Sequence, residues 1–281
     1  MLPERANDQT RQLQLCLLGI LKAIDLVCRE HQLNYYLLAG SCLGAIRHQG
    51  FIPWDDDADV GLPRPDYDRL VAHASEWLPE GYELVSGASN PQYPYSFARI
   101  HDCRTTYILR RQFGFVGGLP VDVYPLDGMT TNKMKRKWHY LRFSLQKKLL
   151  YFCLIDPYKH GRGLHSLLPL AVRHCCNASS LHRKLDQLQR EFDYETSTMV
   201  ADHDYHPDKG VLPKEVFGQP QKVSFEDTQL CTLSQADRYL RHLYGNYMEL
   251  PKELPPQNFR FLDLSMPYRD YVRQQKVEGS V

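Results

Sequence analysis

The chain has 281 residues, which is enough for one large domain or two small ones with an ordinary hydrophobic core. Its 34 Lys and Arg residues nearly balance 33 Asp and Glu, so the formal net charge of +1 excludes a global basic field of the kind that binds nucleic acid. The eight cysteines form no C-x-x-C pair, which disfavours a disulfide framework or a zinc site and favours a reducing compartment.

No segment approaches the ~20 consecutive apolar residues of a membrane-spanning helix. The N-terminus also lacks the apolar stretch of a secretion signal. The sequence therefore predicts a cytoplasmic protein.

Two helices and a strand are predicted in the first fifty residues. Apolar residues recur every three or four positions over residues 13–28, which predicts an amphipathic helix. The run from Tyr35 to Ala39 predicts a buried strand that stops at Gly40, and a helix is expected to open at Ser41 and close at Gly50.

The turn between this strand and helix consists of small residues. Such a turn leaves backbone N–H groups pointing outward at a helix N-terminus, where the helix dipole favours a phosphate. Gly40 and Ser41 are therefore candidate phosphate-binding residues.

An acidic segment follows, in which Asp57-Ala58-Asp59-Val60 alternates carboxylate and apolar side chains. In an extended strand this alternation puts Asp57 and Asp59 on one face, where they repel each other unless a cation lies between them. Oxygen-only ligands favour Mg²⁺. Asp55 shares the predicted face and is expected to support substrate binding, whereas Asp56 is expected to be structural. A solvated acidic turn is the alternative, but apolar residues bracket the segment.

A helix over residues 65–77 and strands over 82–86, 97–100 and 105–109 are predicted next. Arg99 lies in the second of these strands. A guanidinium can bind a diphosphate with two parallel hydrogen bonds, so Arg99 is a candidate for holding a substrate phosphate. A surface ion pair remains an equally good explanation of this arginine.

Asp122 is a lone carboxylate in the run Val121-Asp122-Val123-Tyr124. Burial of an isolated carboxylate is costly, and proteins tolerate it mainly where a cation or a functional partner is present. Asp127, beside Gly128, is instead expected to lie in a turn.

The second half of the chain is predicted to be mainly helical. A basic helix with interleaved aromatic residues is expected over residues 132–152, and either an anionic membrane surface or solvent could face its lysines. Helices are predicted over residues 164–174 and 181–199. Leu167, Leu168 and Leu170 of the first are expected to be buried in the hydrophobic core. The segment from Tyr244 to Arg260 is expected to end a helix at Gly245 and continue as an extended lid of unassigned role.

Residues 40–59 read Gly-Ser-x-Leu-Gly-Ala-x-Arg-His-x-Gly-Phe-Ile-Pro-Trp-Asp-Asp-Asp-x-Asp, which resembles the signature of the LicD family of phosphotransferases, whose distant relatives include fukutin and the fukutin-related protein. The resemblance implies an α/β fold of the nucleotidyltransferase type, with a mixed sheet, flanking helices and a helical C-terminal part. It also implies a third metal-site carboxylate on a neighbouring strand, which Asp122 matches, and a basic residue at the position of Arg99.

The family's activity is implied in the same way. It is a Mg²⁺-dependent phosphotransfer, with Mn²⁺ as an alternative ion, that moves a phospho-alcohol group from a CDP-linked donor to a hydroxyl of a cell-surface glycan, teichoic acid or lipopolysaccharide and releases CMP. The most frequent donor is CDP-choline. The catalytic and metal-binding residues would be Asp57, Asp59 and Asp122, and the substrate-binding residues would be Gly40, Ser41, Arg47, Asp55 and Arg99.

Two other functions stay open at this point. An Asp-x-Asp glycosyltransferase would also use a divalent ion, and a non-catalytic nucleotide-binding regulator is compatible with the same fold. We expect a catalytic core over residues 1–130 and a mainly helical remainder over 131–281 that packs on it. Peripheral contact with the inner face of the membrane stays open as an alternative to a solvated basic helix. The donor head group, the acceptor glycan and the oligomeric state do not follow from the sequence.

Overall fold

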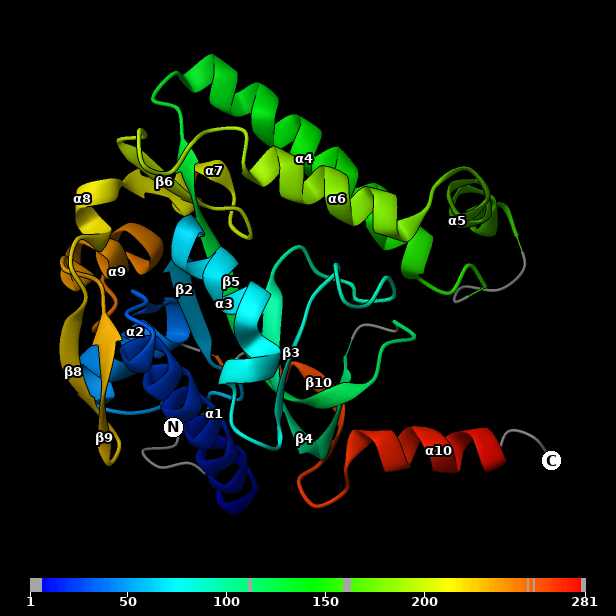
Figure 1. Cartoon of the computed structure of the whole chain (residues 1–281), viewed down its shortest axis with the longest axis horizontal. Coiled ribbons are helices and arrows are strands. Elements are labelled where there is room, and N and C mark those ends of the chain that lie inside the picture. Colours follow the sequence, from blue (N-terminus) through cyan, green and yellow to red (C-terminus); the bar gives the residue numbers. More distant parts are fainter. Residues whose placement is uncertain (1–6, 111–112, 159–162, 252, 255, 279–281) are drawn as a thin grey trace.

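A mixed β-sheet forms the centre of the molecule, and helices surround it (Figure 1). The structure, a computed structural model, describes residues 7–110, 113–158, 163–251, 253–254 and 256–278. The main path of the sheet runs in the order β1 (Tyr36–Leu37), β2 (Asp59–Pro63), β5 (Gly117–Met129), β4 (Ala98–Leu109) and β10 (Phe259–Asp263). Strands β2 and β5 are parallel, while β1 with β2, β5 with β4 and β4 with β10 are antiparallel.

Three further strands extend this sheet, and a separate hairpin lies outside it. Strand β3 (Tyr82–Val85) pairs with β4, β6 (Met199–Asp202) with β5, and β7 (Val211–Pro213) with β6. The hairpin consists of β8 (Gln221–Phe225) and β9 (Thr228–Thr232). The expected α/β class, with a mixed sheet and flanking helices, is confirmed.

The helices divide into those that cover the sheet and those that extend from it. Helices α1 (Asp8–Glu30) and α3 (Arg64–Trp77) pack on the sheet. Helices α4 (Lys133–Leu154) and α6 (Ala178–Gln189) lie side by side, and α5 (Leu164–Cys175) lies beyond them (Figure 1). The others are α2 (Ala39–His48), α7 (Pro207–Gly210), α8 (Lys214–Phe217), α9 (Ala236–Tyr244) and α10 (Tyr268–Glu278).

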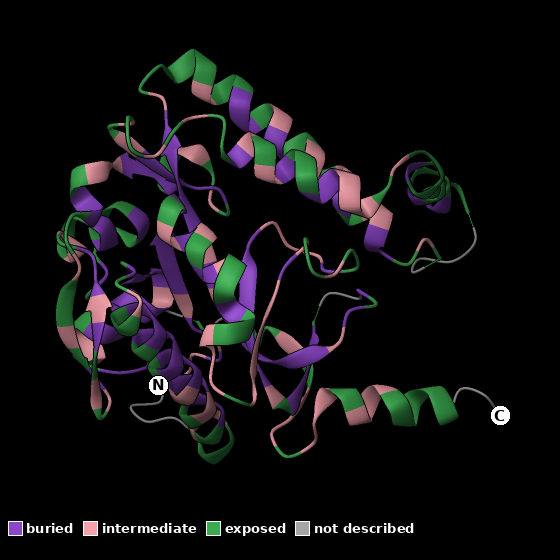
Figure 2. Cartoon of the chain, viewed as in Figure 1, coloured by how far each residue is buried: buried purple, intermediate pink, exposed green. Residues whose placement is uncertain are grey.

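Helix α1 confirms the amphipathic pattern read from the sequence. Its apolar side chains, such as Leu17 and Ile24, are fully buried, while Leu15 and Leu26 face solvent. Figure 2 shows the buried residues concentrated in the sheet and on the inner side of this helix. Asn7 caps the helix by accepting a hydrogen bond from the backbone N–H of Thr10 at 2.8 Å.

Several predicted boundaries were wrong. Strand β1 has only two residues, and α2 already begins at Ala39, so Gly40 and Ser41 lie in the first turn of the helix rather than before it. The helix ends at His48 because Gln49 adopts the left-handed conformation, with φ of 55°. The two predicted strands over residues 97–109 form one continuous strand, and α6 ends at Gln189 instead of reaching residue 199.

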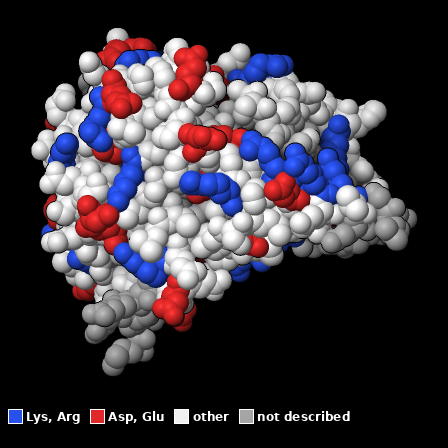
Figure 3. Space-filling model, turned by 60° about the horizontal axis from the view of Figure 1, so that its bottom comes forward, with Lys and Arg blue, Asp and Glu red and all other residues white. Residues whose placement is uncertain are grey.

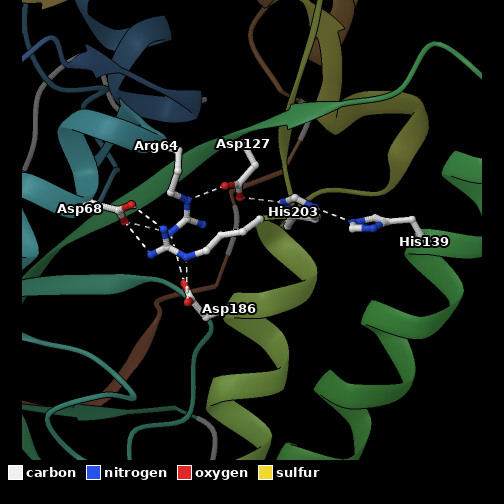
Figure 4. Close-up of polar contacts among 7 residues, drawn as sticks. Arg64, Asp68, Asp127, His139, Asp186 and His203 are labelled. Atoms are coloured by element: carbon white, nitrogen blue, oxygen red, sulfur yellow. Dashed lines mark hydrogen bonds and ion pairs between the residues drawn. The ribbon is translucent and has the colours of Figure 1, made fainter. Parts of the chain in front are cut away.

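Asp127 does not lie in a turn, as predicted, but inside strand β5 opposite Ala201. Its side chain is 1% exposed, and it lies between Arg64 and His203 (Figure 4). The guanidinium Nε of Arg64 is 2.5 Å from Asp127 Oδ1, and Nδ1 of His203 is 3.1 Å from Oδ2. His203 in turn contacts His139 of α4 at 2.9 Å, so a buried polar chain connects α3, the sheet and α4.

The leucines of α5 also contradict the prediction. Leu167, Leu168 and Leu170 are 59%, 54% and 37% exposed instead of buried. The buried residues of this helix are Ser166, Pro169 and Val172.

The part of the chain after residue 130 contributes strands β6, β7 and β10 to the central sheet, as well as helices. The division near residue 130 remains a prediction. In the described ranges, no helix is both long and apolar enough to cross a bilayer. The face shown in Figure 3 carries acidic and basic side chains interspersed, as the balanced charge predicts.

Candidate active site

Two of the predicted catalytic aspartates lie on adjacent parallel strands. Asp59 is the first residue of β2, and it is the register partner of Asp122 on β5. The hydroxyl of Tyr124 lies between the two carboxylates, 3.4 Å from Asp59 Oδ1 and 3.2 Å from Asp122 Oδ2. The parallel pairing therefore brings together two side chains that are 63 positions apart in the sequence.

Asp55 and Asp57 precede β2 and are not part of the strand, so the strand predicted to carry them was wrong at this end, although both carboxylates lie close enough to Asp59 to raise its pKa. Long-range contacts instead hold the segment of residues 55–58, the acidic turn, in place. The side-chain amide of Gln14 on α1 donates to the backbone carbonyls of Ile52 and Asp55, at 3.0 Å and 3.1 Å. The turn is thereby fixed to the first helix of the chain.

Asn258 holds the turn from the other side. Its backbone N–H donates to Asp56 Oδ2 at 2.9 Å, and its side-chain Nδ2 donates to Asp56 Oδ1 at 3.0 Å and Asp57 Oδ2 at 2.6 Å. Asn258 immediately precedes β10, the edge strand that pairs with β4. The C-terminal segment thus reaches back to the acidic turn.

The carboxylates raise one another's pKa because they are close together and withdrawn from water. Burial, followed by the charges of Asp122 and Asp56, raises the pKa of Asp57 to about 6. Burial and the charge of Asp57 raise the pKa of Asp55 and of Asp59 well above the usual value. This concentration of negative charge attracts a cation.

Arg99 is the register partner of Asp122 on β4 and binds it with two contacts. The distances are 2.6 Å from Nε to Oδ1 and 3.1 Å from a terminal guanidinium nitrogen to Oδ2. The guanidinium also lies 4.2 Å from the ring centroid of Tyr95. Burial raises the pKa of Asp122, and Arg99 opposes this rise. In this structure Arg99 orients a carboxylate, and its contact with a substrate phosphate remains a prediction.

Gly40 and Ser41 lie at the start of α2, which has no side-chain cap. The first backbone N–H groups of a helix have no partner within the helix. The N–H of Ala39 donates to the Tyr239 hydroxyl at 3.0 Å, so phosphate binding by Gly40 and Ser41 remains a prediction. The Ser41 hydroxyl accepts a hydrogen bond from the backbone N–H of Asp59 at 2.9 Å and so fixes the start of β2. A Cβ at Gly40 would come within 2.8 Å of Asp55 Oδ2, so the absence of a side chain lets the acidic turn approach α2.

Arg47 lies near the other end of α2 and faces the C-terminal segment. It donates to the backbone carbonyl of Tyr247 at 2.7 Å and contacts His48 Nε2 at 2.9 Å. It therefore anchors the chain that follows α9. Its predicted role in substrate binding stays a prediction.

A cavity of about 520 Å³ opens beside the carboxylates, a size typical of small-molecule sites. Asp57, Asp122 and Arg99 line it, whereas Gly40, Ser41, Arg47, Asp55 and Asp59 are not part of the described lining. One wall is aromatic, and Lys147, Arg110 and Asp204 add charged groups. The aromatic residues of the lining are Tyr95, Phe97, Tyr107, Phe113, Tyr124 and Tyr151.

The donor chemistry of the carboxylate cluster suits a hard cation such as Mg²⁺, because all the available ligands are oxygens and their mutual repulsion favours a positive charge between them. Within the described residues, however, no three acidic, His or Cys side chains are arranged as a ligand set. Arg99 engages both oxygens of Asp122. The metal requirement remains a prediction.

The region that carries these carboxylates also matches a known protein family. Residues 32–151 match the sequence model described as LicD/FKTN/FKRP, nucleotidyltransferase domain. The chain contains a LicD-family domain. This match spans α2, the acidic turn, the paired aspartates and most of α4.

Curated relatives extend the similarity beyond the LicD-family domain. The lipopolysaccharide cholinephosphotransferase LicD of Haemophilus influenzae is 29% identical over 262 residues, which cover 86% of this chain and 92% of the relative. Uncharacterized proteins of Rickettsia prowazekii and Rickettsia typhi are 31% and 34% identical over 48% and 43% of this chain, which is 40% and 37% of their own lengths.

Sequence reasoning missed several residues at the site of the LicD-family domain. Asn258 lies outside the matched range, and no local pattern links it to Asp57. Tyr124 lies two positions after Asp122 on β5, so the two-residue period of a strand could have placed both on one face. Tyr95, Phe97 and Arg99 follow one another at two-residue intervals, but Tyr95 and Phe97 both lie before β4, so the strand pattern did not single them out.

Proposed function

We propose that this protein is a phosphotransferase that moves phosphocholine from CDP-choline to a hydroxyl of a lipopolysaccharide or a related cell-surface glycan, such as a teichoic acid, and releases CMP. The observation that carries the proposal is a single cavity in which a carboxylate cluster meets an aromatic wall. The name and the coverage of the Haemophilus influenzae relative support the same reaction class and acceptor.

The aromatic wall supports choline as the head group. The rings of Tyr95 and Phe97 stack with centroids 4.9 Å apart, and Phe97 and Tyr124 lie 4.4 Å apart. A quaternary ammonium cannot donate a hydrogen bond and is bound instead by aromatic faces. Asp204 lies in the same lining, where Lys147 pairs with it at 2.9 Å, so the aromatic rings rather than a free carboxylate carry this argument. Ethanolamine, glycerol and ribitol head groups gain less from such a wall because they carry hydrogen-bonding groups.

The residues of the site have separate roles in the proposed transfer. The backbone N–H groups of Gly40 and Ser41 at the start of α2 bind donor phosphate. Arg99 with Tyr124 orients Asp122, which accepts the proton of the acceptor hydroxyl. Asp57 and Asp59, with Asp122, would hold Mg²⁺, which when bound would neutralise the charge of the donor diphosphate as CMP leaves. Mn²⁺ has the same ligand preference and is the alternative ion.

We place the reaction in the cytoplasm. All eight cysteines are free thiols in the structure, which supports a reducing compartment.

Phosphorus NMR of the purified protein tests the proposal. The protein is incubated with Mg²⁺, a lipopolysaccharide acceptor and, in separate samples, CDP-choline, CDP-ethanolamine, CDP-glycerol or CDP-ribitol. We expect CMP and a new phosphodiester with CDP-choline, and neither in Asp57→Asn. The control is Asp156→Asn, which changes an exposed aspartate outside the cavity lining. Turnover of another CDP conjugate alone would change the head group, and turnover of none would overturn the proposal.

A further inference from the structure

Helix α4 is apolar on two opposite sides. His139, Tyr140, Phe143 and Leu150 are buried against the rest of the molecule. On the other side, Met134, Trp138, Leu141 and Leu145 follow one another at spacings of four, three and four residues, and each is at least 55% exposed. A solvated surface helix has a polar outer side, so the packing of the described residues does not explain this stripe.

Helix α5 has a similar exposed stripe. Leu164, Leu167 and Leu168 are 82%, 59% and 54% exposed. Arg173 of α5 donates to the backbone carbonyls of Cys153 and Ile155, at 3.0 Å and 2.7 Å, and so fixes α5 to the C-terminal end of α4. Both helices lie at the periphery, where Figure 2 shows many exposed residues.

The charges that α4 and α5 themselves carry have a single sign, although Glu191, which pairs with Arg142, lines the same surface hollow as Leu145. Helix α4 contains seven Lys and Arg residues and no Asp or Glu, and α5 has no acidic residue either. Lys137 and Lys148 flank the stripe, and together with Lys133 and Lys135 they are exposed and form no ion pair with the described part of the chain. The face in Figure 3, by contrast, mixes both signs.

We propose that the outer side of α4, together with α5, docks on the surface of an anionic lipid bilayer. An apolar stripe flanked by unpaired lysines is suited to a boundary where acyl chains meet negatively charged headgroups. A second copy of the chain fits this face less well, because two lysine-flanked stripes would repel each other.

The docking surface and the cavity share one helix. Lys147, Leu150 and Tyr151 of α4 line the cavity, so docking of the outer side of α4 would hold the cavity close to the membrane. A glycolipid acceptor embedded in that membrane would then be presented at the site. The docking itself does not depend on the proposed transfer reaction, and it can be measured without a donor.

Vesicle sedimentation of the full chain tests the proposal. Vesicles of phosphatidylcholine with phosphatidylglycerol are compared with vesicles of phosphatidylcholine alone, at low and high salt. We expect binding to the anionic vesicles that weakens with salt. The double variant Leu141→Asp, Leu145→Asp should reduce binding at least about tenfold, since charges in the stripe oppose insertion. The matched control is Leu15→Asp, which changes a leucine of α1 that is 50% exposed and should bind like the unaltered protein.

Tryptophan fluorescence gives a second readout at the surface itself. Trp138 is 60% exposed, so its emission should shift to the blue on binding anionic vesicles, and Trp138→Phe should remove that shift. All of these substitutions are at exposed positions, and thermal melting verifies that the variants fold. Transfer to a deacylated, water-soluble acceptor should stay unchanged in the Leu141→Asp, Leu145→Asp variant.

Three results would overturn the docking proposal. They are no binding to anionic vesicles at low salt, equal binding by the double variant, or a dimer in light scattering that the double variant dissociates. Failure of every CDP donor would leave the vesicle result intact, so the two proposals fail separately.

Discussion

Asn258 donates a hydrogen bond of 2.6 Å from its side-chain amide to Asp57, which is 201 positions earlier in the sequence. The same residue also binds Asp56 through both its backbone and its side chain. The segment after α9, whose role the sequence left open, therefore supplies a positioning residue for the acidic turn.

Replacement of Asn258 should lower transfer without unfolding the protein. Loss of a group that orients a catalytic carboxylate typically costs about 10–100-fold, so we expect Asn258→Ala to reduce kcat/KM by about that factor. Asn258→Asp should be worse, because it adds a negative charge beside Asp56 and Asp57. Steady-state kinetics with CDP-choline measures the effect, and Gln257→Ala, at the exposed neighbouring position, is the control. Equal kinetics for the Asn258 variants and the control would refute the assignment.

Because Arg99 and Asp122 form a buried pair, substitutions of the two residues should change the free energy of unfolding non-additively. Removal of one partner from a buried pair typically costs about 3–5 kcal/mol, because the other charge is left uncompensated. We expect Arg99→Met to show such a loss in urea denaturation, and Arg99→Met with Asp122→Asn to regain most of it. Both proteins should be inactive. Additive losses in the double variant would show that the pair is not coupled.

Arg64 offers an internal comparison of buried and exposed partners. It contacts Asp127, whose side chain is 1% exposed, and Asp186, whose side chain is 48% exposed (Figure 4). Asp127→Ala should lower the free energy of unfolding by about 3–5 kcal/mol, and Asp186→Ala by at most about 1 kcal/mol. Chemical denaturation measures both. Similar losses in the two variants would contradict the buried network.

His101 should make stability depend on pH. It is 1% exposed, both ring nitrogens lack a hydrogen-bond partner among the described residues, and burial followed by the charge of Arg99 lowers its pKa to about 3. A lowered folded-state pKa gives stability that is present above the unfolded value near 6.5 and is lost as pH falls toward about 3. His101 alone therefore lowers the Tm between pH 7 and pH 5, whereas carboxylates with a raised pKa, such as Asp57, act in the opposite direction.

The variant His101→Leu isolates this effect. A leucine cannot be protonated, so the Tm of the variant, measured relative to the unaltered protein, should rise as the pH falls from 7 to 5. His73→Leu is the matched control, because His73 is exposed on α3 and should leave the pH dependence as it was. An unchanged slope in His101→Leu would show that another group controls the acid response.

The sequence predicted those features of the site that local patterns encode. Asp59 and Asp122 could be placed on strands because each alternates with apolar residues, and the parallel pairing of β2 and β5 then made them neighbours. The acidic turn could not be predicted, because Gln14 and Asn258 determine its shape from distant parts of the chain.

Two other predictions were wrong because they, too, depend on what surrounds a residue in space rather than on its neighbours in the sequence. Asp127 resembled a turn residue beside Gly128, but Arg64 and His203 compensate its charge inside the sheet. Leu167 and Leu168 resembled core residues because their helical spacing is that of a buried face. Periodicity identifies an apolar face but not what covers it, so their exposure became visible only in the structure.

The most direct test of the central claim is the mass of the acceptor after reaction. A lipopolysaccharide-derived oligosaccharide is incubated with the protein, CDP-choline and Mg²⁺, and parallel samples contain Asp59→Asn or EDTA. We expect the acceptor to gain the mass of one phosphocholine group with the active protein, and to stay unchanged in both parallel samples. An unchanged acceptor with the active protein, or a gain that Asp59→Asn does not abolish, would contradict that claim.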